Sequence, residues 1–159
     1  MDEPARHNVR MTLALLAAYQ LLGSLDLVRA AFTEPLAEMV RDATTAMLDY
    51  AEDPYQAMVD LAKAREEHFF GAGFTFEHAV DDGTRFHQDV HRCLYHEVLA
   101  GNGSPELAPV MCAFDGNWIE AIDPDRHGFR FDRATTIGTG GPVCPFHFNR
   151  VTASATPAG

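Results

Sequence analysis

The sequence predicts an α+β protein in which a helical N-terminal half packs on a small antiparallel sheet. Apolar residues recur with helical spacing through about the first 70 residues, as in Leu13, Leu16 and Leu21. Beyond Gly73, apolar and polar residues alternate between turn signals, which is typical of strands. The chain has 159 residues, the size of one domain. We therefore expect a single α+β domain over residues 1–151 and a flexible tail over residues 152–159, which are small and polar.

The first helix is expected to contain the apolar stretch Met11–Leu22. A signal peptide is the alternative interpretation of such a stretch. However, Asp2 and Glu3 lie before it and no small-residue cleavage site follows it, so a buried amphipathic helix is favoured. Gly23 then breaks the helical pattern, and Ser24 can cap the helix that follows.

Two combinations of a capping residue and a proline divide the rest of the N-terminal half. Thr33 precedes Pro35 by two residues, and Asp53 directly precedes Pro54. Because proline is tolerated in the first turn of a helix, each combination predicts that a new helix begins there. The last of these helices is expected to end near Phe69, before a glycine-rich stretch.

A β-hairpin is expected after these glycines. Phe74–Val80 alternates between apolar and polar residues, and Asp81-Asp82-Gly83 is a strong turn signal. Arg85–Cys93 can supply the partner strand, and Leu94–Ala100 predicts a short helix after it.

The remaining chain predicts two helical stretches and two strands. Ser104-Pro105-Glu106 is expected to cap a helix that runs to about Phe114, and a shorter helix holds Trp118. A strand is expected over Phe129–Ile137. The glycine-rich segment Gly138–Gly141 then predicts a tight hairpin into a last strand over Val143–Val151. This segment differs from phosphate-binding loops because it opens no helix.

The charge of the chain bears on its partners. The chain has 12 Lys and Arg and 23 Asp and Glu, which gives a formal net charge of -11. This negative charge repels phosphate backbones and anionic lipids, so we expect neither nucleic acid nor a membrane as a partner. No apolar run approaches the roughly 20 residues of a spanning helix. Three cysteines are too few for a disulfide scaffold, so the protein is expected to be cytoplasmic with reduced thiols. The expected partner is a small molecule, and a homo-oligomer is possible.

The three cysteines are candidates for a chemical role. Cys93, Cys112 and Cys144 fall in three different predicted elements, so they can meet in the folded protein. A thiolate is both a nucleophile and a soft metal ligand, so Cys93 or Cys144 could act in catalysis, or all three could hold zinc or iron. The alternative is that the cysteines pack as small apolar residues.

Two histidines and an aspartate are further candidate catalytic residues. His87, Asp89, His91 and Cys93 are spaced by two, so on a strand all four would share one face. His87 or His91 could move protons beside a thiol, or be a structural histidine. Asp115 could orient a histidine, or cap the turn that follows it.

Arg130 and Arg133 are candidate substrate-binding residues. The chain has few basic residues, and a guanidinium can hold a carboxylate through two hydrogen bonds. The alternative is that each arginine pairs with the many acidic residues of the surface.

In order, these features resemble the L-2-amino-thiazoline-4-carboxylic acid hydrolase family. The likeness is strongest over about residues 70–150 and lies in a helical N-terminal half followed by an ordered set of segments. These are Phe86–Cys93, Ser104-Pro105-Glu106-Leu107, Cys112 with Asp115, Phe129-Arg130-Phe131-Asp132-Arg133, Thr135-Thr136-Ile137, and a Gly-Gly-x-x-Cys-x-Phe ending at Phe146.

The resemblance implies a cytoplasmic hydrolase that opens a small carbon–nitrogen heterocycle. In the reaction of the family name, water adds to an amidine-like ring carbon and the thiazoline opens toward a carbamoyl-cysteine. A relative could act on another strained or amidine ring, for instance in natural-product metabolism or self-resistance.

Two other functions remain open at this stage. The terminal Cys-x-Phe, with its glycine turn and two earlier cysteines, also resembles the vinyl-reductase-type small-molecule-binding domains. A protein of that kind would bind a metal or a ligand without turnover. The second alternative is an accessory subunit whose acidic surface docks on a larger enzyme.

Overall fold

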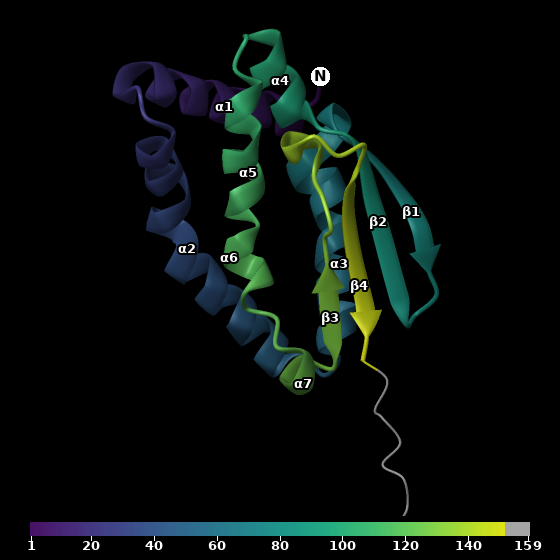
Figure 1. The fold of residues 1–159 in the computed structure, drawn as a ribbon. Helices are drawn as coiled ribbons and strands as arrows, with labels where there is room; N and C mark the ends of the chain where they lie inside the picture. The colour runs from purple at the N-terminus through teal and green to yellow at the C-terminus, as the bar shows by residue number, and fades with distance from the viewer. Residues whose placement is uncertain (152–159) are drawn as a thin grey trace, which may run out of the picture.

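The computed structural model describes residues 1–151 and confirms the predicted α+β class. Helices fill the N-terminal half, and a four-stranded antiparallel sheet lies in the C-terminal part (Figure 1). The tail predicted over residues 152–159 lies outside the described residues. None of the helices in residues 1–151 is long and apolar enough to cross a membrane.

Three long helices begin at side-chain caps. Asp2 caps α1 (Glu3–Leu22), Ser24 caps α2 (Leu25–Tyr50) and Asp53 caps α3 (Pro54–Arg65). Each cap accepts a hydrogen bond from a backbone N–H in the first turn, which has no partner within the helix. The predictions for Ser24 and Asp53 are therefore confirmed.

The predicted helix start at Thr33 is wrong, because α2 continues through Pro35 without interruption. Thr33 lies within the helix, and its hydroxyl donates to the carbonyl of Arg29 at 2.8 Å. An interior proline costs about 3 kcal/mol. Packing at both ends stabilises the helix. Val28, near its start, is buried in a cluster with Leu15 and Leu99, and Leu48, near its end, is buried in the cluster that contains the phenylalanines of the sheet.

The end of α3 has a shape that the sequence pattern did not predict. The helix passes into a π-helical turn, η1 (Glu66–Phe70), and then a short 3-10 turn, η2 (Gly71–Gly73). The buried Asn8 of α1 donates to the carbonyl of Phe69 at 2.7 Å, and Asp2 accepts from the N–H of Ala72 at 2.8 Å. Side chains from α1 thus satisfy backbone groups that the irregular turns leave free.

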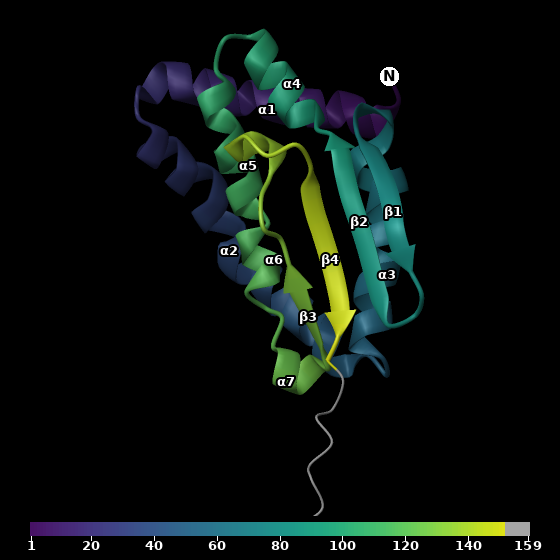
Figure 2. The same cartoon turned by 45° about the vertical axis from the view of Figure 1, so that its right-hand side comes forward.

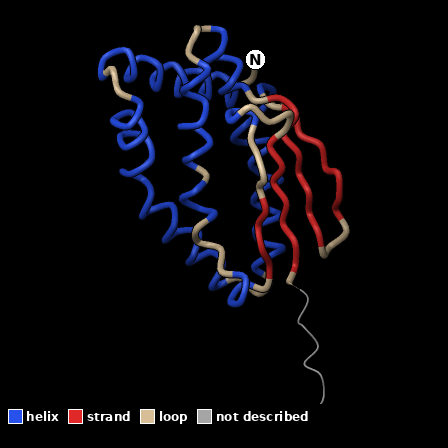
Figure 3. Tube along the Cα trace, in the orientation of Figure 1, coloured by secondary structure: helices blue, strands red, loops and turns tan. Residues whose placement is uncertain are grey.

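The sheet has the strand order β1-β2-β4-β3, and all neighbouring strands are antiparallel. The predicted hairpin is present as β1 (Thr75–Asp81) and β2 (Arg85–Arg92). The last strand, β4 (Cys144–Arg150), lies between β2 and β3 (Phe129–Asp132). Figure 3 shows that the four strands form one layer beside the helices.

Between β2 and β3 the chain forms short helices. They are α4 (Leu94–Gly101), the 3-10 turn η3 (Pro105–Leu107), α5 (Ala108–Phe114), α6 (Gly116–Ile119) and α7 (Pro124–His127). Ser104 precedes η3 as expected, but its side chain makes no capping hydrogen bond. The helix α7 was not predicted. Its cap is Asp123, which accepts from two backbone N–H groups.

The strand predicted over Phe129–Ile137 is too long. It ends at Asp132, and Ile137 instead begins a 3-10 turn, η4 (Ile137–Thr139). Thr136 and Thr139 each accept the backbone N–H of the other, so this turn satisfies its own polar groups without a strand partner. The connection between β3 and β4 is therefore a wide loop rather than a tight hairpin.

The two faces of the sheet differ in their surroundings. Phe86, Gln88, Val90 and Phe148 are buried on the inner face, which the helices cover. Residues in between, such as His87, lie on the outer face because side chains alternate along a strand. Figure 2 shows α3 against the sheet and α2, α5 and α6 farther from it.

Candidate active site

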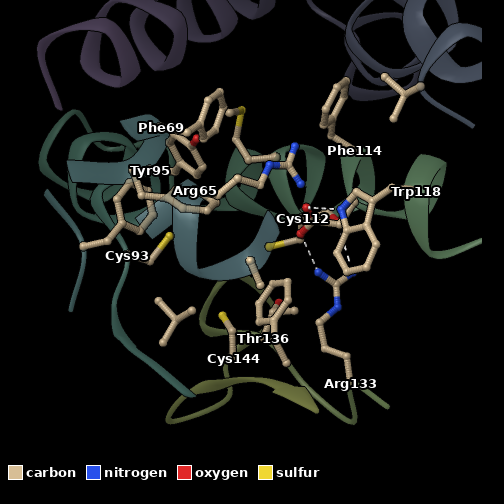
Figure 4. A pocket seen from close by; sticks show the side chains of 18 of the residues that line it. Arg65, Phe69, Cys93, Tyr95, Cys112, Phe114, Trp118, Arg133, Thr136 and Cys144 are labelled. Carbon is tan, nitrogen blue, oxygen red and sulfur yellow. Dashed lines mark hydrogen bonds and ion pairs between the residues drawn. The ribbon is translucent and has the colours of Figure 1, made fainter. Parts of the chain in front are cut away.

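A cavity of about 620 Å³ lies between the inner face of the sheet and the helices. Helices α2 and α3, the turn η1 and the α5–α6 segment supply its other walls. Most of the lining is apolar or aromatic, and it includes Met11, Phe32, Leu36, Val40, Met58, Leu61, Phe70, Phe74, Phe76, Val90, Met111, Phe114, Phe146 and Phe148. A few polar side chains enter this apolar space, as is typical of small-molecule sites (Figure 4).

Asp115 is the carboxylate in the cavity wall. It lies where α5 passes into α6, and its side chain makes no capping bond to α6. Trp118 donates its indole N–H to Oδ1 of Asp115 at 3.1 Å, and Arg133 donates to Oδ2 at 2.6 Å. Arg133 also donates to the carbonyl of Cys112 at 3.1 Å, so its guanidinium is held in one orientation.

Burial raises the pKa of Asp115 above its ordinary value. The positive charge of Arg133 and the hydrogen bond from Trp118 oppose this rise, but burial is the larger effect. A carboxyl group that lines a cavity and has a raised pKa is a candidate for exchanging protons with a bound molecule.

Arg65 brings a second positive charge to the cavity. It is the last residue of α3, and Figure 4 shows its side chain extending toward Cys112 and Trp118. Its guanidinium carbon lies 5.6 Å from the ring centroid of Phe69. Within residues 1–151 it forms no hydrogen bond or ion pair, whereas Arg133 is paired with Asp115. The charge of Arg65 is therefore available to a ligand.

The three cysteines all reach this cavity, as Figure 4 shows. All three are free thiols. Burial raises the pKa of Cys93 to about 12 and also raises the pKa of Cys144, whose sulfur accepts the N–H of Ile137 at 3.1 Å. Cys93 and Cys144 are therefore protonated at neutral pH. Among residues 1–151, no group of three His, Cys, Asp or Glu side chains is arranged to hold a metal ion.

Cys93 does not share a face with His87, Asp89 and His91, which corrects that prediction. Thr75 pairs with Arg92 while the next residue, Phe76, pairs with Val90, so β2 holds one extra residue at His91. Such a bulge reverses the alternation beyond it. Cys93 therefore turns to the cavity.

Three of the candidate residues lie on the outer face of the sheet. The ring of His87 stacks on that of His147, with centroids 4.0 Å apart, and His87 also hydrogen-bonds Asn149 at 2.8 Å. His91 lies 2.9 Å from Glu77. Arg130 lies 3.1 Å from Asp132. The strand pleat thus separates His87, His91 and Arg130 from the cavity, while Arg133, Asp115 and the cysteines line it.

Sequence reasoning missed Arg65 as a site residue. Met58, Leu61 and Arg65 follow one another at helical spacing, so Arg65 continues the inward stripe of α3. A positively charged residue at the end of an apolar helix face was the sequence signal that could have identified Arg65 as a site residue. Tyr95 and Trp118 also line the cavity, and burial raises the pKa of Tyr95.

Comparison with known proteins identifies the family. The sequence profile of the L-2-amino-thiazoline-4-carboxylic acid hydrolase family matches residues 8–148. No curated protein and no solved structure shows significant similarity to the chain. The match includes the N-terminal helices as well as the sheet, and it covers every residue that lines the cavity. The chain belongs to the L-2-amino-thiazoline-4-carboxylic acid hydrolase family.

Proposed function

We propose that this protein is a hydrolase that opens a small nitrogen-containing heterocycle, with Asp115 as its general base. The observation that carries the proposal is the carboxylate of Asp115, which is mostly buried in an apolar cavity and has a raised pKa. Membership of a family named for a hydrolase supports the reaction class. The bound partner is then a small molecule, which is the kind of substrate that the name of the family implies.

The reaction of a 2-amino-thiazoline ring can be written with Asp115 as the only proton carrier. The oxygen of a water molecule bonds to the ring carbon between sulfur and nitrogen, and Asp115 moves one water proton to the ring nitrogen. The carbon–sulfur bond then breaks, and Asp115 moves the remaining hydroxyl proton to the departing sulfur. The product is a carbamoyl group and a free thiol, and the carboxylate is restored. In a ring without sulfur, a carbon–nitrogen bond breaks in its place.

The two arginines of the cavity have different roles in this proposal. Arg65 binds the carboxylate of the substrate, because its guanidinium is not paired within residues 1–151. Arg133 is a positioning residue, since it holds Asp115 at 2.6 Å and stabilises its ionised form. Cys93 is not proposed as the nucleophile, because a thiol with a pKa of about 12 is almost never a thiolate at neutral pH.

Ring opening of 2-amino-thiazoline-4-carboxylate, followed by mass spectrometry of the carbamoyl-cysteine product, tests the proposal. We expect Asp115→Asn to lower kcat by about 100-fold or more, the usual loss when a general base is removed. Asp89→Asn is the matched control, because Asp89 has a similar exposure, 21% against 26%, but lies on the outer face beside His147.

Two results would contradict the proposal. An Asp115→Asn variant with wild-type turnover would exclude Asp115 as the base. Saturable binding without any turnover by the wild-type protein would instead favour a ligand-binding module, the alternative that an apolar cavity also suits.

A further inference from the structure

We infer that the substrate of this cavity is an amphipathic organic anion much larger than 2-amino-thiazoline-4-carboxylate, with its anionic group at Arg65 and an apolar body along α2 and η1. The inference rests on the proposed function, because it names the substrate class of the same site. Four observations carry it: the volume of the cavity, its apolar walls, its apolar opening and the positive charge of Arg65, which is unpaired within residues 1–151.

The cavity is too large for the small ring alone. A thiazoline carboxylate has about nine non-hydrogen atoms, and even at the roughly 30 Å³ that a water molecule occupies these would fill only about 270 Å³. The cavity has about 620 Å³, which is within the range of pockets for drug-sized ligands, roughly 300–1,000 Å³. More than half of the space would remain for other parts of the substrate.

The walls around that remaining space are apolar. Phe32, Leu36 and Val40 of α2 face the cavity, as do Phe69 and Phe70 of η1. A small polar ring would leave these side chains in contact with water. An apolar substituent on the substrate would cover them and gain free energy in proportion to the buried area.

The opening of the cavity is apolar, like its walls. Leu36 and Phe69 line the cavity and are also 43% and 36% exposed, so they lie where it meets solvent. Pro35 is exposed beside them. An apolar mouth favours entry of a molecule with an apolar body over that of a fully polar one.

The charge of the ligand follows from Arg65. Its positive charge is close enough to Asp115 to oppose the rise in the pKa of that carboxyl group, yet Arg65 has no ion-pair partner within residues 1–151. An anion is the ligand group that neutralises this charge in an apolar space. A carboxylate on the heterocycle would place the ring between Arg65 and Asp115.

Ligand binding can be measured without turnover, because Trp118 is the only tryptophan of the chain and lines the cavity. Its fluorescence is titrated with octanoate, octan-1-ol and acetate, which separate the apolar body from the charge. We expect octanoate to bind at least about tenfold more tightly than either of the others. Equal affinity for octanoate and acetate, or for octanoate and octan-1-ol, would overturn the inference.

A pair of variants tests the role of Arg65. Arg65→Gln is expected to weaken octanoate binding by about tenfold or more, the loss of one charge-assisted contact. Arg10→Gln removes the same charge from the exposed side of α1 and is expected to leave binding unchanged. An unchanged affinity in Arg65→Gln would contradict the assignment, and the comparison of octanoate with octan-1-ol on the wild-type protein needs no variant.

A kinetic experiment distinguishes this inference from the proposed function. The wild-type protein is assayed with 2-amino-thiazoline-4-carboxylate and with its 2-hexylamino derivative, which has the same ring and carboxylate. We expect kcat/KM to be at least about thirtyfold higher for the derivative, because its methylene groups are buried. Opening of both rings at equal kcat/KM overturns the inference alone. Opening of neither ring overturns the proposed function, and the fluorescence titration still decides the ligand class.

Discussion

The guanidinium of Arg133 lies 2.6 Å from the carboxylate of Asp115, and the two side chains are only 16% and 26% exposed. The pair joins the loop after β3 to the junction of α5 and α6, and so connects the sheet to the far wall of the cavity. The sequence suggested a catalytic role for Asp115 and a substrate-binding role for Arg133. In the structure the two side chains form one ion pair.

Arg133→Gln tests that relationship through both stability and pH dependence. Removing one partner of a mostly buried pair leaves the other charge uncompensated, so we expect a loss of about 3 kcal/mol in unfolding free energy. Arg133 lowers the pKa of Asp115, so its removal raises that pKa. The acidic limb of kcat/KM should then move to higher pH. Urea unfolding and a pH–rate profile measure the two effects, and an unchanged profile would contradict a base at Asp115.

The raised pKa of Asp115 predicts a pH dependence of stability. Because the pKa in the folded protein lies above 3.8, the ordinary value, the folded state binds the proton more tightly than the unfolded chain does. The resulting stability is complete below about pH 3.8 and is lost as pH rises through the folded pKa. We expect Asp115→Asn, which mimics the neutral acid, to gain stability relative to wild type as pH rises from about 4 to 7. A constant difference in urea unfolding over this range would contradict the prediction.

Cys93 is expected to react slowly with alkylating reagents. With a pKa of about 12, about one thiol in ten thousand is ionised at pH 8, so iodoacetamide should modify it about a thousandfold more slowly than a free thiol. Mass spectrometry of the native protein measures the rate, and the urea-unfolded protein is the control. Rapid modification of Cys93 with parallel loss of turnover would instead identify a nucleophilic thiolate.

Substitution of His87 and His91, on the outer face of the sheet, tests whether a histidine rather than Asp115 carries the proton. His87 contacts His147 and Asn149, and His91 contacts Glu77, all on the face of the sheet away from the cavity. We expect His87→Gln and His91→Gln to retain turnover within about twofold, since neither ring reaches the bound molecule. A hundredfold loss in a folded His91→Gln variant would return the catalytic role to that histidine.

A side chain at position 138, in place of Gly138, is expected to destabilise the folded protein. A Cβ there would lie 2.7 Å from the sulfur of Cys112 and 3.2 Å from the backbone carbon of Ala108. Gly138→Ala should therefore cost about 1–3 kcal/mol in unfolding free energy. The same change should cost less in a Cys112→Ala background, which removes the nearer contact. Additive costs in this double-mutant cycle would show that Cys112 is not the obstacle.

The sequence alone determined the elements whose signals are local. Asp53 before Pro54 predicted the start of α3, because a capping oxygen and a preset φ act within one turn. Asp82 and Gly83 predicted the β1–β2 hairpin because the residues that favour a turn also act locally. The family was also recognisable from the ordered segments around Cys93, Cys112 and Cys144, and the profile match over residues 8–148 confirms it.

Only the tertiary structure decided which side chains share the cavity. Packing at both ends carries α2 through Pro35, and a one-residue bulge at His91 turns Cys93 inward while the histidines stay outside. Arg65 and Asp115 lie 50 positions apart in the sequence and meet only because α3 and α5 line the same space. Such contacts depend on the free energy of packing across the whole chain, which no local pattern encodes.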